Sequence, residues 1–123
     1  MVATKDRAGV LPDLVRSLAR QTIQPERFEI LILDNGSRDD TAGQVHRLKE
    51  KYPTLRLHYS FLPVANASLA RNEGALQAKG RVLAFLDDDC RVGPDWIQRA
   101  LKKLRQPGIR ALGGPALVPN SKI

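Results

Sequence analysis

Short apolar runs alternate with amphipathic segments along this chain, and neither low-complexity sequence nor a repeat of constant period interrupts them. The short runs predict β-strands, because they are partly β-branched and bounded by turn residues. The segments between them carry apolar residues at helical spacing, which predicts helices. This order of strands and helices is typical of α/β domains with a mostly parallel sheet. With 123 residues the chain is long enough for one modest domain.

The expected elements follow from these runs and from the residues that bound them. Helices are expected at residues 9–21, between the cap candidates Asp39–Thr41 and Pro53, at 68–78 and at 96–105. Strands are expected at 28–33, 55–60 and 82–86, and the stretch 111–123 has room for one short strand. Gly80 is expected to end the third helix in the left-handed conformation, and Asp95 to cap the fourth, with Gly108 just past its end.

Acidic residues directly follow two of the expected strands. Asp34 comes after the run 28–33, and Asp87–Asp89 come after the run 82–86. Parallel strands end at the same edge of a sheet, and ligands bind at that edge in open α/β sheets. We therefore expect these carboxylates to lie at a ligand site.

The three consecutive aspartates Asp87, Asp88 and Asp89 have two readings when taken alone. Neighbouring carboxylates disfavour common ionisation, so the triplet favours a bound cation. Hard oxygen donors suit Mg²⁺ or Mn²⁺, which commonly bridge protein carboxylates to substrate phosphates. The other reading is a solvated acidic loop that caps a helix after Pro94.

The chain is strongly basic, with a formal net charge of +7 and a sequence pI near 10.1. Such a surface favours anionic partners in general, whether nucleotide, membrane headgroup or nucleic acid. Aromatic residues are few and no long run of Lys or Arg occurs, which argues against nucleic acid as the partner. Cys90 is the single cysteine and no signal-peptide pattern opens the chain, so a cytoplasmic setting is expected.

A family resemblance is carried by six segments in a characteristic order. They are Thr4-Lys5-Asp6-Arg7, Gln21-Thr22, Ile32-Leu33-Asp34-Asn35-Gly36-Ser37-Arg38-Asp39, Ala70-Arg71-Asn72-Glu73-Gly74, Gly80-Arg81-Val82-Leu83-Ala84-Phe85-Leu86-Asp87-Asp88-Asp89 and Pro94-Asp95-Trp96. Together they resemble the nucleotide-binding half of GT-A glycosyltransferases, with the greatest similarity to the large inverting family numbered two. The resemblance extends to about Gly114 and favours the cation reading of the aspartate triplet.

The resemblance implies a three-layer α/β/α fold with a mostly parallel sheet. It implies attack of an acceptor hydroxyl on a nucleoside-diphosphate sugar, with a UDP-sugar as the favoured donor and a sugar or a lipid-linked molecule as the acceptor. Residues 1–123 would form a single partial donor-binding domain, with a shortened first strand and with the acceptor half missing. Two alternatives are a non-catalytic nucleotide-binding module and, with less support, a Mg²⁺-dependent phosphoacceptor domain of flavodoxin-like topology.

Two segments of the resemblance correspond to the nucleoside site. Asp34 matches a carboxylate that accepts a hydrogen bond from the base, a role that suits an acceptor-only group. Asn35 and Gly36 would shape the same pocket, Gly36 by adopting backbone angles that other residues resist. Thr4, Asp6 and Arg7 match the turn that cradles base and ribose. At Lys5 the family more often has an aromatic residue, which leaves base stacking there in doubt.

The aspartate triplet corresponds to the family's D-x-D element. Asp87 matches its first position, a ligand of ribose or metal, and Asp89 matches its last position, a direct metal ligand. Asp88 lies between them with a ribose role. The cation, Mn²⁺ or Mg²⁺, would stabilise the nucleotide as leaving group. Arg71 matches a residue of the A-R-N segment, where it either contacts phosphate or packs.

Three departures from the family pattern bear on function. The first strand offers only Met1-Val2-Ala3 as apolar residues, so exposed sheet edges and self-association are expected. Asn66 stands where a glycine is usual, and Asn tolerates positive φ better than most residues. No residue matches the general base that inverting transfer needs, so the chain by itself is expected to be inactive.

One basic set keeps two readings. Arg99, Lys102, Lys103 and Arg105 lie on one expected helix, where they form either a solvated face or a peripheral contact with an anionic membrane. No apolar stretch approaches the ~20 residues that span a bilayer.

Overall fold

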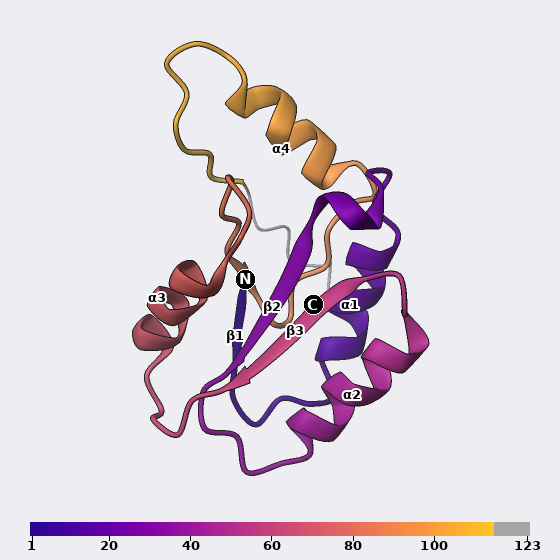
Figure 1. Cartoon of the computed structure of the whole chain (residues 1–123), viewed down its shortest axis with the longest axis vertical. Helices are drawn as coiled ribbons and strands as arrows, with labels where there is room; N and C mark the ends of the chain where they lie inside the picture. Colours follow the sequence, from indigo (N-terminus) through magenta and orange to yellow (C-terminus); the bar gives the residue numbers. More distant parts are fainter. Residues whose placement is uncertain (115–123) are drawn as a thin grey trace, which may run out of the picture.

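Four parallel strands form the centre of the structure, a computed structural model that describes residues 1–114 (Figure 1). The strands are β1 (Val2–Thr4), β2 (Glu29–Asp34), β3 (Arg56–Phe61) and β4 (Leu86–Asp87). Their order in the sheet is β3-β2-β1-β4, so β1 lies inside the sheet with β2 and β4 as its neighbours. This arrangement confirms the predicted α/β class with a parallel sheet.

Helices cover both faces of the sheet. They are α1 (Leu11–Ala19), α2 (Thr41–Lys51), α3 (Ala67–Gln77) and α4 (Trp96–Leu104), and a short 3₁₀ turn, η1, spans Pro25–Arg27. The helices α1 and α2 lie on one side and α3 lies on the other, while α4 lies beyond one end of the sheet (Figure 1). The core is therefore a three-layer α/β/α arrangement.

The alternation of side chains along β2 explains why its apolar run is almost continuous. Ile30 and Ile32 pack into the cluster with α1 and α2, where Leu14 is fully buried. Leu31 and Leu33 point to the opposite face and pack with Ala70 of α3. A strand that is covered on both faces needs apolar residues at successive positions, because neighbouring side chains point to opposite faces, as in parallel sheets generally.

The helix boundaries agree with the predictions to within a few residues, whereas the predicted caps agree only in part, because Asp39 accepts the Thr41 amide at the start of α2. Asp40 and Asp95 stand at the N-cap positions of α2 and α4, and neither side chain makes a capping hydrogen bond. Asn66 does cap α3, because its side chain accepts a hydrogen bond from the Leu69 amide at 3.0 Å. Its φ of −141° is extended, so the tolerance of Asn for positive φ is not used here.

The left-handed ending predicted at Gly80 is wrong. The helix α3 ends at Gln77, and the chain leaves it in an extended conformation at Ala78. Positive φ among glycines of the described chain occurs at Gly36 and Gly108, of which the latter follows α4 as expected. The amides of Lys79 and Gly80 instead donate to the Glu29 carboxylate at 2.6 and 3.1 Å, which ties this turn to the start of β2.

The strand predicted at 82–86 is also wrong in length, because β4 contains only Leu86 and Asp87. These two residues pair with Val2 and Ala3 of the three-residue strand β1, and a strand extends only as far as its partner. Val82, Leu83 and Phe85 are consequently 48%, 44% and 52% exposed rather than buried. Residues 111–114 are not a strand, and the rest of the short strand expected in 111–123 lies outside the described residues.

The helices of the described residues are all too short or too polar to cross a membrane.

Candidate functional site

The loops that follow β1, β2 and β4 meet at the carboxyl edge of the sheet. The Asn35 amide donates to the Thr4 carbonyl at 2.8 Å, which joins the first two loops. The Asp6 carboxylate accepts hydrogen bonds from the amides of Arg38 and Asp39 at 2.6 and 3.2 Å, across the same junction. The structure thus brings together the sequence segments in which the site residues were predicted.

The Asp34 carboxylate, at the end of β2, is almost fully buried and engaged within the chain. It is 1% exposed. One oxygen accepts the Ser37 amide at 2.8 Å, which closes the turn that follows β2. The other oxygen accepts the Tyr59 hydroxyl from β3 at 2.6 Å. Burial, and then the hydrogen bond to Asp34, raise the pKa of the Tyr59 hydroxyl, so it remains a donor at neutral pH.

The turn after Asp34 is shaped by Asn35 and Gly36. Asn35 is 7% exposed, and its side-chain oxygen accepts the Asn66 amide at 2.6 Å, which connects the turn to the start of α3. Gly36 has a φ of +79°, a conformation that L-residues rarely adopt. The predicted conformational role of Gly36 is therefore present in the structure.

The Asp6 backbone is also unusual. Its φ is +52°, and it is the one non-glycine residue with positive φ in the described chain. Its amide donates to the Ser37 hydroxyl at 2.8 Å, in addition to the bonds that its carboxylate accepts. Short polar side chains tolerate this conformation best when local hydrogen bonds support it. Asp6 therefore connects the loops after β1 and β2 through these hydrogen bonds.

The alternation of side chains separates the members of the aspartate triplet. Asp87 pairs in register with Ala3, whose side chain packs on the α3 side of the sheet, and Asp87 lies 3.6 Å from the Arg71 guanidinium of α3. Asp88 points to the other face, is 5% exposed and accepts the Thr4 hydroxyl at 2.8 Å. Asp88 thus connects β4 to the end of β1.

Arg7 spans the second and third carboxylates of the triplet. One of its guanidinium nitrogens lies 2.9 Å from Asp88, and another lies 3.2 Å from Asp89. The Asp88 side chain is 7% exposed and the Asp89 side chain 56% exposed. Together with Arg71 at Asp87, these contacts place an arginine beside each carboxylate.

Ligand atoms of Asp87, Asp89 and Cys90 lie within 4.8 Å of one another, so these three residues could hold a cation. The two carboxylates offer the hard oxygen donors that Mg²⁺ and Mn²⁺ prefer, and such ions usually complete their coordination with water and phosphate oxygens. The thiol of Cys90 is a softer donor and a poorer match. Cys90 also packs against the cluster of α1 and α2. The donor set therefore fits a divalent cation through Asp87 and Asp89.

Sequence reasoning missed Tyr59 and Asp39 as parts of this edge. Tyr59 pairs in register with Ile32, which places it diagonally across from Asp34 on the same face of the sheet. Only the register between β2 and β3 reveals this neighbour. Asp39 was considered a cap candidate, and its carboxylate accepts the amides of Ala8 and Thr41 at 3.0 and 3.1 Å. Its hydrogen bonds, first with the Thr41 hydroxyl, lower its pKa.

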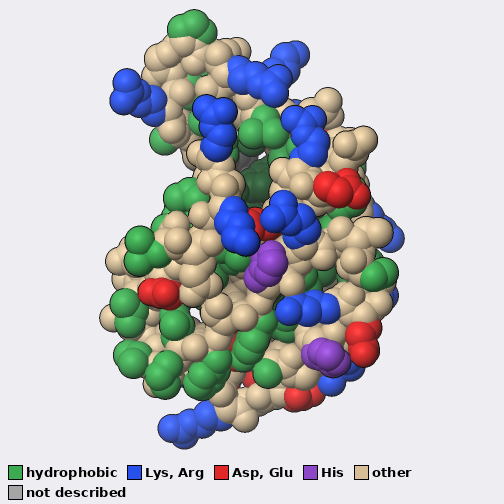
Figure 2. All heavy atoms as spheres, in the orientation of Figure 1, with side chains coloured by type: hydrophobic (Ala, Val, Ile, Leu, Met, Phe, Trp, Pro, Cys, Tyr) green, Lys and Arg blue, Asp and Glu red, His purple; other side chains and the backbone are tan. Residues whose placement is uncertain are grey.

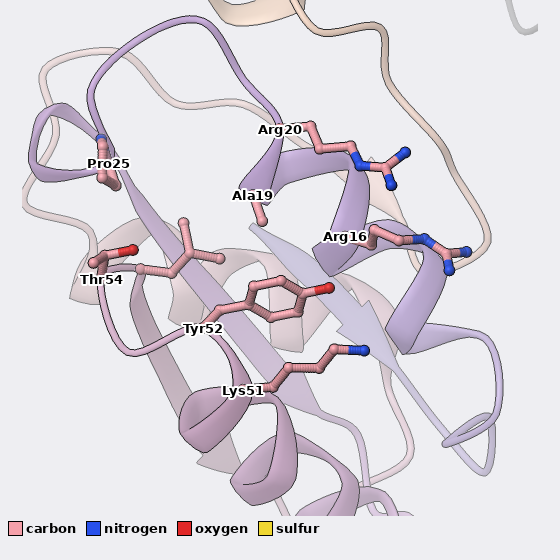
Figure 3. A pocket seen from close by; sticks show the side chains of 8 residues that line it. Arg16, Ala19, Arg20, Pro25, Lys51, Tyr52 and Thr54 are labelled. Atoms are coloured by element: carbon pink, nitrogen blue, oxygen red, sulfur yellow. The ribbon is translucent and has the colours of Figure 1, made fainter.

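A cavity of about 410 Å³ lies away from these residues, beside the amino ends of β2 and β3 (Figure 3). Arg16 of α1, Arg20 just past the end of α1 and Lys51 at the end of α2 surround it, with the Tyr52 ring between them. Basic residues at helix carboxyl ends complement the helix dipole, which accounts for their presence. The predicted site residues lie elsewhere, at the open carboxyl edge of the sheet.

Comparison with known proteins places this arrangement in a family. The model of the family described as "Glycosyl transferase family 2" matches residues 1–122. The glycosyltransferase AglE of Haloferax volcanii is 30% identical over 114 residues, which are 93% of this chain and 37% of AglE. The chain therefore spans little more than a third of the length of this relative.

Two solved structures show the same fold. A crystal structure of S. aureus TarS residues 1–349 in complex with UDP is 25% identical, with a TM-score of 0.75 over 94% of this chain and 37% of that one. The mannosyltransferase PcManGT of Pyrobaculum calidifontis, in complex with GDP-Man and Mn²⁺, is 24% identical. Its TM-score is 0.83 over 88% of this chain and 32% of that one. This chain belongs to glycosyl transferase family 2 and has the GT-A fold.

Proposed function

We propose that this chain is the donor-binding part of an enzyme that transfers a sugar from a nucleoside-diphosphate sugar to an acceptor hydroxyl with the help of a divalent cation. The observation that carries the proposal is the set of carboxylates at the carboxyl edge of the central strands, with Asp87 and Asp89 able to share a cation. Family membership supports the reaction class. The proposal also assigns residues 1–123 to a single partial domain.

The nucleoside would lie over the turns after β1 and β2. We assign the shape of this surface to Asp6, Asn35 and Gly36, since these residues lock the two turns against each other. The direct contact of Asp34 with the base stays a prediction. A carboxylate that accepts two hydrogen bonds still has accepting lone pairs, but Asp34 is 1% exposed and its established partners are Ser37 and Tyr59.

The diphosphate would lie beside the exposed aspartates. We assign Asp87 and Asp89 to a Mn²⁺ or Mg²⁺ ion, which supplies Lewis-acid stabilisation of the leaving nucleotide when bound. Asp88 accepts the hydrogen bond from the Thr4 hydroxyl and so holds the loop in position. We also propose that Asp88 contacts the ribose. Arg71 is exposed at the same edge and would contact phosphate rather than pack, because its side chain is 47% exposed.

Calorimetric titration of UDP into the chain, with and without Mn²⁺, tests the proposal. Binding is expected with Mn²⁺ and is expected to be lost in Asp89→Ala. Asp95→Ala removes a carboxylate of similar exposure at the N-cap of α4 and should leave binding unchanged. Titration of GDP is the next arm, since TarS is bound to UDP and PcManGT to GDP-Man in their structures. A folded chain that binds neither nucleotide would contradict the proposal.

The chain by itself would bind donor without completing transfer. The support is that no residue matches the general base of an inverting enzyme, which deprotonates the acceptor hydroxyl. This leaves a non-catalytic nucleotide-binding module as the second candidate function for the isolated chain. Metal-dependent binding without release of free sugar or nucleotide from UDP-sugar is the expected result. Turnover comparable to that of a family enzyme would contradict this part.

We propose a cytoplasmic setting with peripheral contact to an anionic membrane, where a lipid-linked or sugar acceptor is available. The support is the basic side of α4, where Arg99, Lys102 and Lys103 are exposed. Figure 2 shows Lys and Arg side chains gathered over the end of the molecule where α4 lies. Cosedimentation with vesicles that contain phosphatidylglycerol, but not with pure phosphatidylcholine vesicles, is expected. Equal binding to both would contradict it.

A further inference from the structure

Arg7 holds two carboxylates that differ in their freedom. Asp88 is buried and is fixed by the Thr4 hydroxyl at 2.8 Å, whereas Asp89 is exposed and belongs to the candidate cation site. The Arg7 guanidinium lies 2.9 Å from Asp88 and 3.2 Å from Asp89. A planar guanidinium with several N–H donors can rotate away from one carboxylate while it keeps the other.

The loop that carries Arg7 is held in place. The preceding residue, Asp6, is bonded to Ser37, Arg38 and Asp39, and the Arg7 carbonyl accepts the Val10 amide at 3.1 Å. The side chain is nevertheless 46% exposed. The backbone of Arg7 is therefore anchored, and its guanidinium is the part that can move.

A cation at Asp87 and Asp89 would compete with Arg7 for Asp89. The Asp89 carboxylate would then have both the Arg7 guanidinium and a divalent ion beside it, and these two positive charges repel each other. Binding of the ion alone should therefore weaken the contact between Arg7 and Asp89 without providing a new partner for the guanidinium. A diphosphate beside the ion would provide that partner, because arginine binds phosphate oxygens in a bidentate manner.

We propose that Arg7 is an internal counter-cation of Asp89, displaced by the divalent ion and then bound by the donor diphosphate while it pivots on Asp88. This inference deepens the proposed function and rests on it. Arg7 thereby couples the two ligands, so each binds more tightly in the presence of the other. By linkage, the factor by which Mn²⁺ raises the affinity for UDP equals the factor by which UDP raises the affinity for Mn²⁺.

Arg7 differs in this respect from Arg71. Arg71 lies 3.6 Å from a single carboxylate, Asp87, and its contact is longer than either contact of Arg7. Removal of the Arg71 charge should therefore change the affinity for the ion alone by less than removal of the Arg7 charge. This difference separates a specific contact from a general effect of charge near the carboxylates.

The competition between Arg7 and the ion is tested by titration with Mn²⁺ alone. The electron paramagnetic resonance signal of free Mn²⁺ decreases as the ion binds, and this decrease measures the affinity. In Arg7→Gln the affinity for Mn²⁺ is expected to rise about fivefold or more, the lower end of common coupling factors. Arg99→Gln removes the same charge on α4, where Arg99 pairs with Asp95, and should leave it unchanged. Arg7→Lys keeps the positive charge but lacks the planar guanidinium, so its affinity for Mn²⁺ should lie between those of wild type and Arg7→Gln. Equal Mn²⁺ affinity in wild type and both Arg7 variants would overturn the inference.

The contact between Arg7 and the donor diphosphate is tested by titration of UDP and UMP in the presence of Mn²⁺. In Arg7→Gln the coupling between Mn²⁺ and UDP is expected to fall about fivefold or more, with little change for UMP, which lacks the second phosphate. Unchanged coupling would overturn the inference even when wild type binds UDP. If wild type binds neither UDP nor GDP with Mn²⁺, the proposed function fails first, and the diphosphate step fails with it. Circular dichroism of each variant confirms that the fold is retained.

Discussion

The Tyr59 hydroxyl of β3 donates a hydrogen bond of 2.6 Å to the buried Asp34 carboxylate at the end of β2. The register pairs Tyr59 with Ile32, so the bond runs diagonally along one face of the sheet. Asp34 also accepts the Ser37 amide, which closes the turn leading to the candidate site. A residue on the edge strand therefore helps to set the position of a turn over the central strands.

Tyr59→Phe should destabilise the fold because it leaves an Asp34 oxygen buried without this donor. The expected loss in the free energy of unfolding is about 1.5–3 kcal/mol, the usual range for hydrogen bonds to charged groups. Urea unfolding measures it. Tyr52→Phe is the matched control, since the Tyr52 hydroxyl has no hydrogen-bond partner within residues 1–114, and it should change stability little. Equal losses in both variants would contradict the role given to this bond.

Asp39 should make the free energy of unfolding depend on pH in the acidic range. Hydrogen bonds, first from the Thr41 hydroxyl and then from the Ala8 amide, hold the pKa of Asp39 below its ordinary value of 3.8. A carboxyl whose pKa is lowered by folding stabilises the protein above its unfolded pKa and loses that contribution as pH falls through its folded pKa. Wild type should thus be more stable than Asp39→Asn at pH 6, and the difference should shrink as the pH falls below 3.8. Thr41→Val should reduce the same pH dependence, and a difference independent of pH would contradict this account.

Gly36→Ala should cost about 1–2 kcal/mol, the usual penalty for an L-residue in the left-handed region. The φ of Gly36 is +79°, while an added Cβ would lie 3.5 Å from the Leu62 carbonyl oxygen, which is an ordinary contact. The cost therefore comes from the backbone and not from a clash. Gly9→Ala is the control, because nothing lies within 4 Å of a Cβ there and its φ is not positive. Thermal or urea unfolding that ranks the two variants equally would contradict the assignment.

The exposed apolar run before β4 should cause self-association of the chain. Leu83 and Phe85 are 44% and 52% exposed, and β4 is at the edge of the sheet. Size-exclusion chromatography with light scattering should show oligomers that the double variant Leu83→Lys/Phe85→Lys converts to monomer. The double variant Thr54→Lys/Gln106→Lys adds the same charge at other exposed positions and should still associate. A monodisperse wild-type monomer would contradict this prediction.

The sequence predicted the helices and the longer strands because the spacing of apolar residues within each segment indicates its type. The place of Asp34 at the end of the apolar run 28–33 predicted its position at the carboxyl edge of the sheet, where it ends β2 beside Thr4 of β1. The resemblance of the motifs then identified the family, which the match over residues 1–122 confirms. These features required no knowledge of long-range contacts.

The errors concern features that depend on distant partners. The length of β4 is limited by the three residues of β1, which the apolar run at 82–86 does not reveal. Gly80 does not end α3 in the left-handed conformation, because the Glu29 carboxylate binds the following turn instead. The contacts of Arg7 and Tyr59 likewise depend on which loops and strands become neighbours. Sequence spacing alone contains no such information.

The most direct test of the donor site is paramagnetic broadening of amide NMR signals by Mn²⁺ in the presence of UDP. We expect the signals of residues 5–7, 35–37 and 87–90 to disappear at substoichiometric Mn²⁺, while those of Arg20, Tyr52 and Thr54 beside the distant cavity remain. The broadening should be lost in Asp89→Ala. Broadening centred on other carboxylates, or its persistence in Asp89→Ala, would contradict the placement of the cation and nucleotide at the carboxyl edge of the sheet.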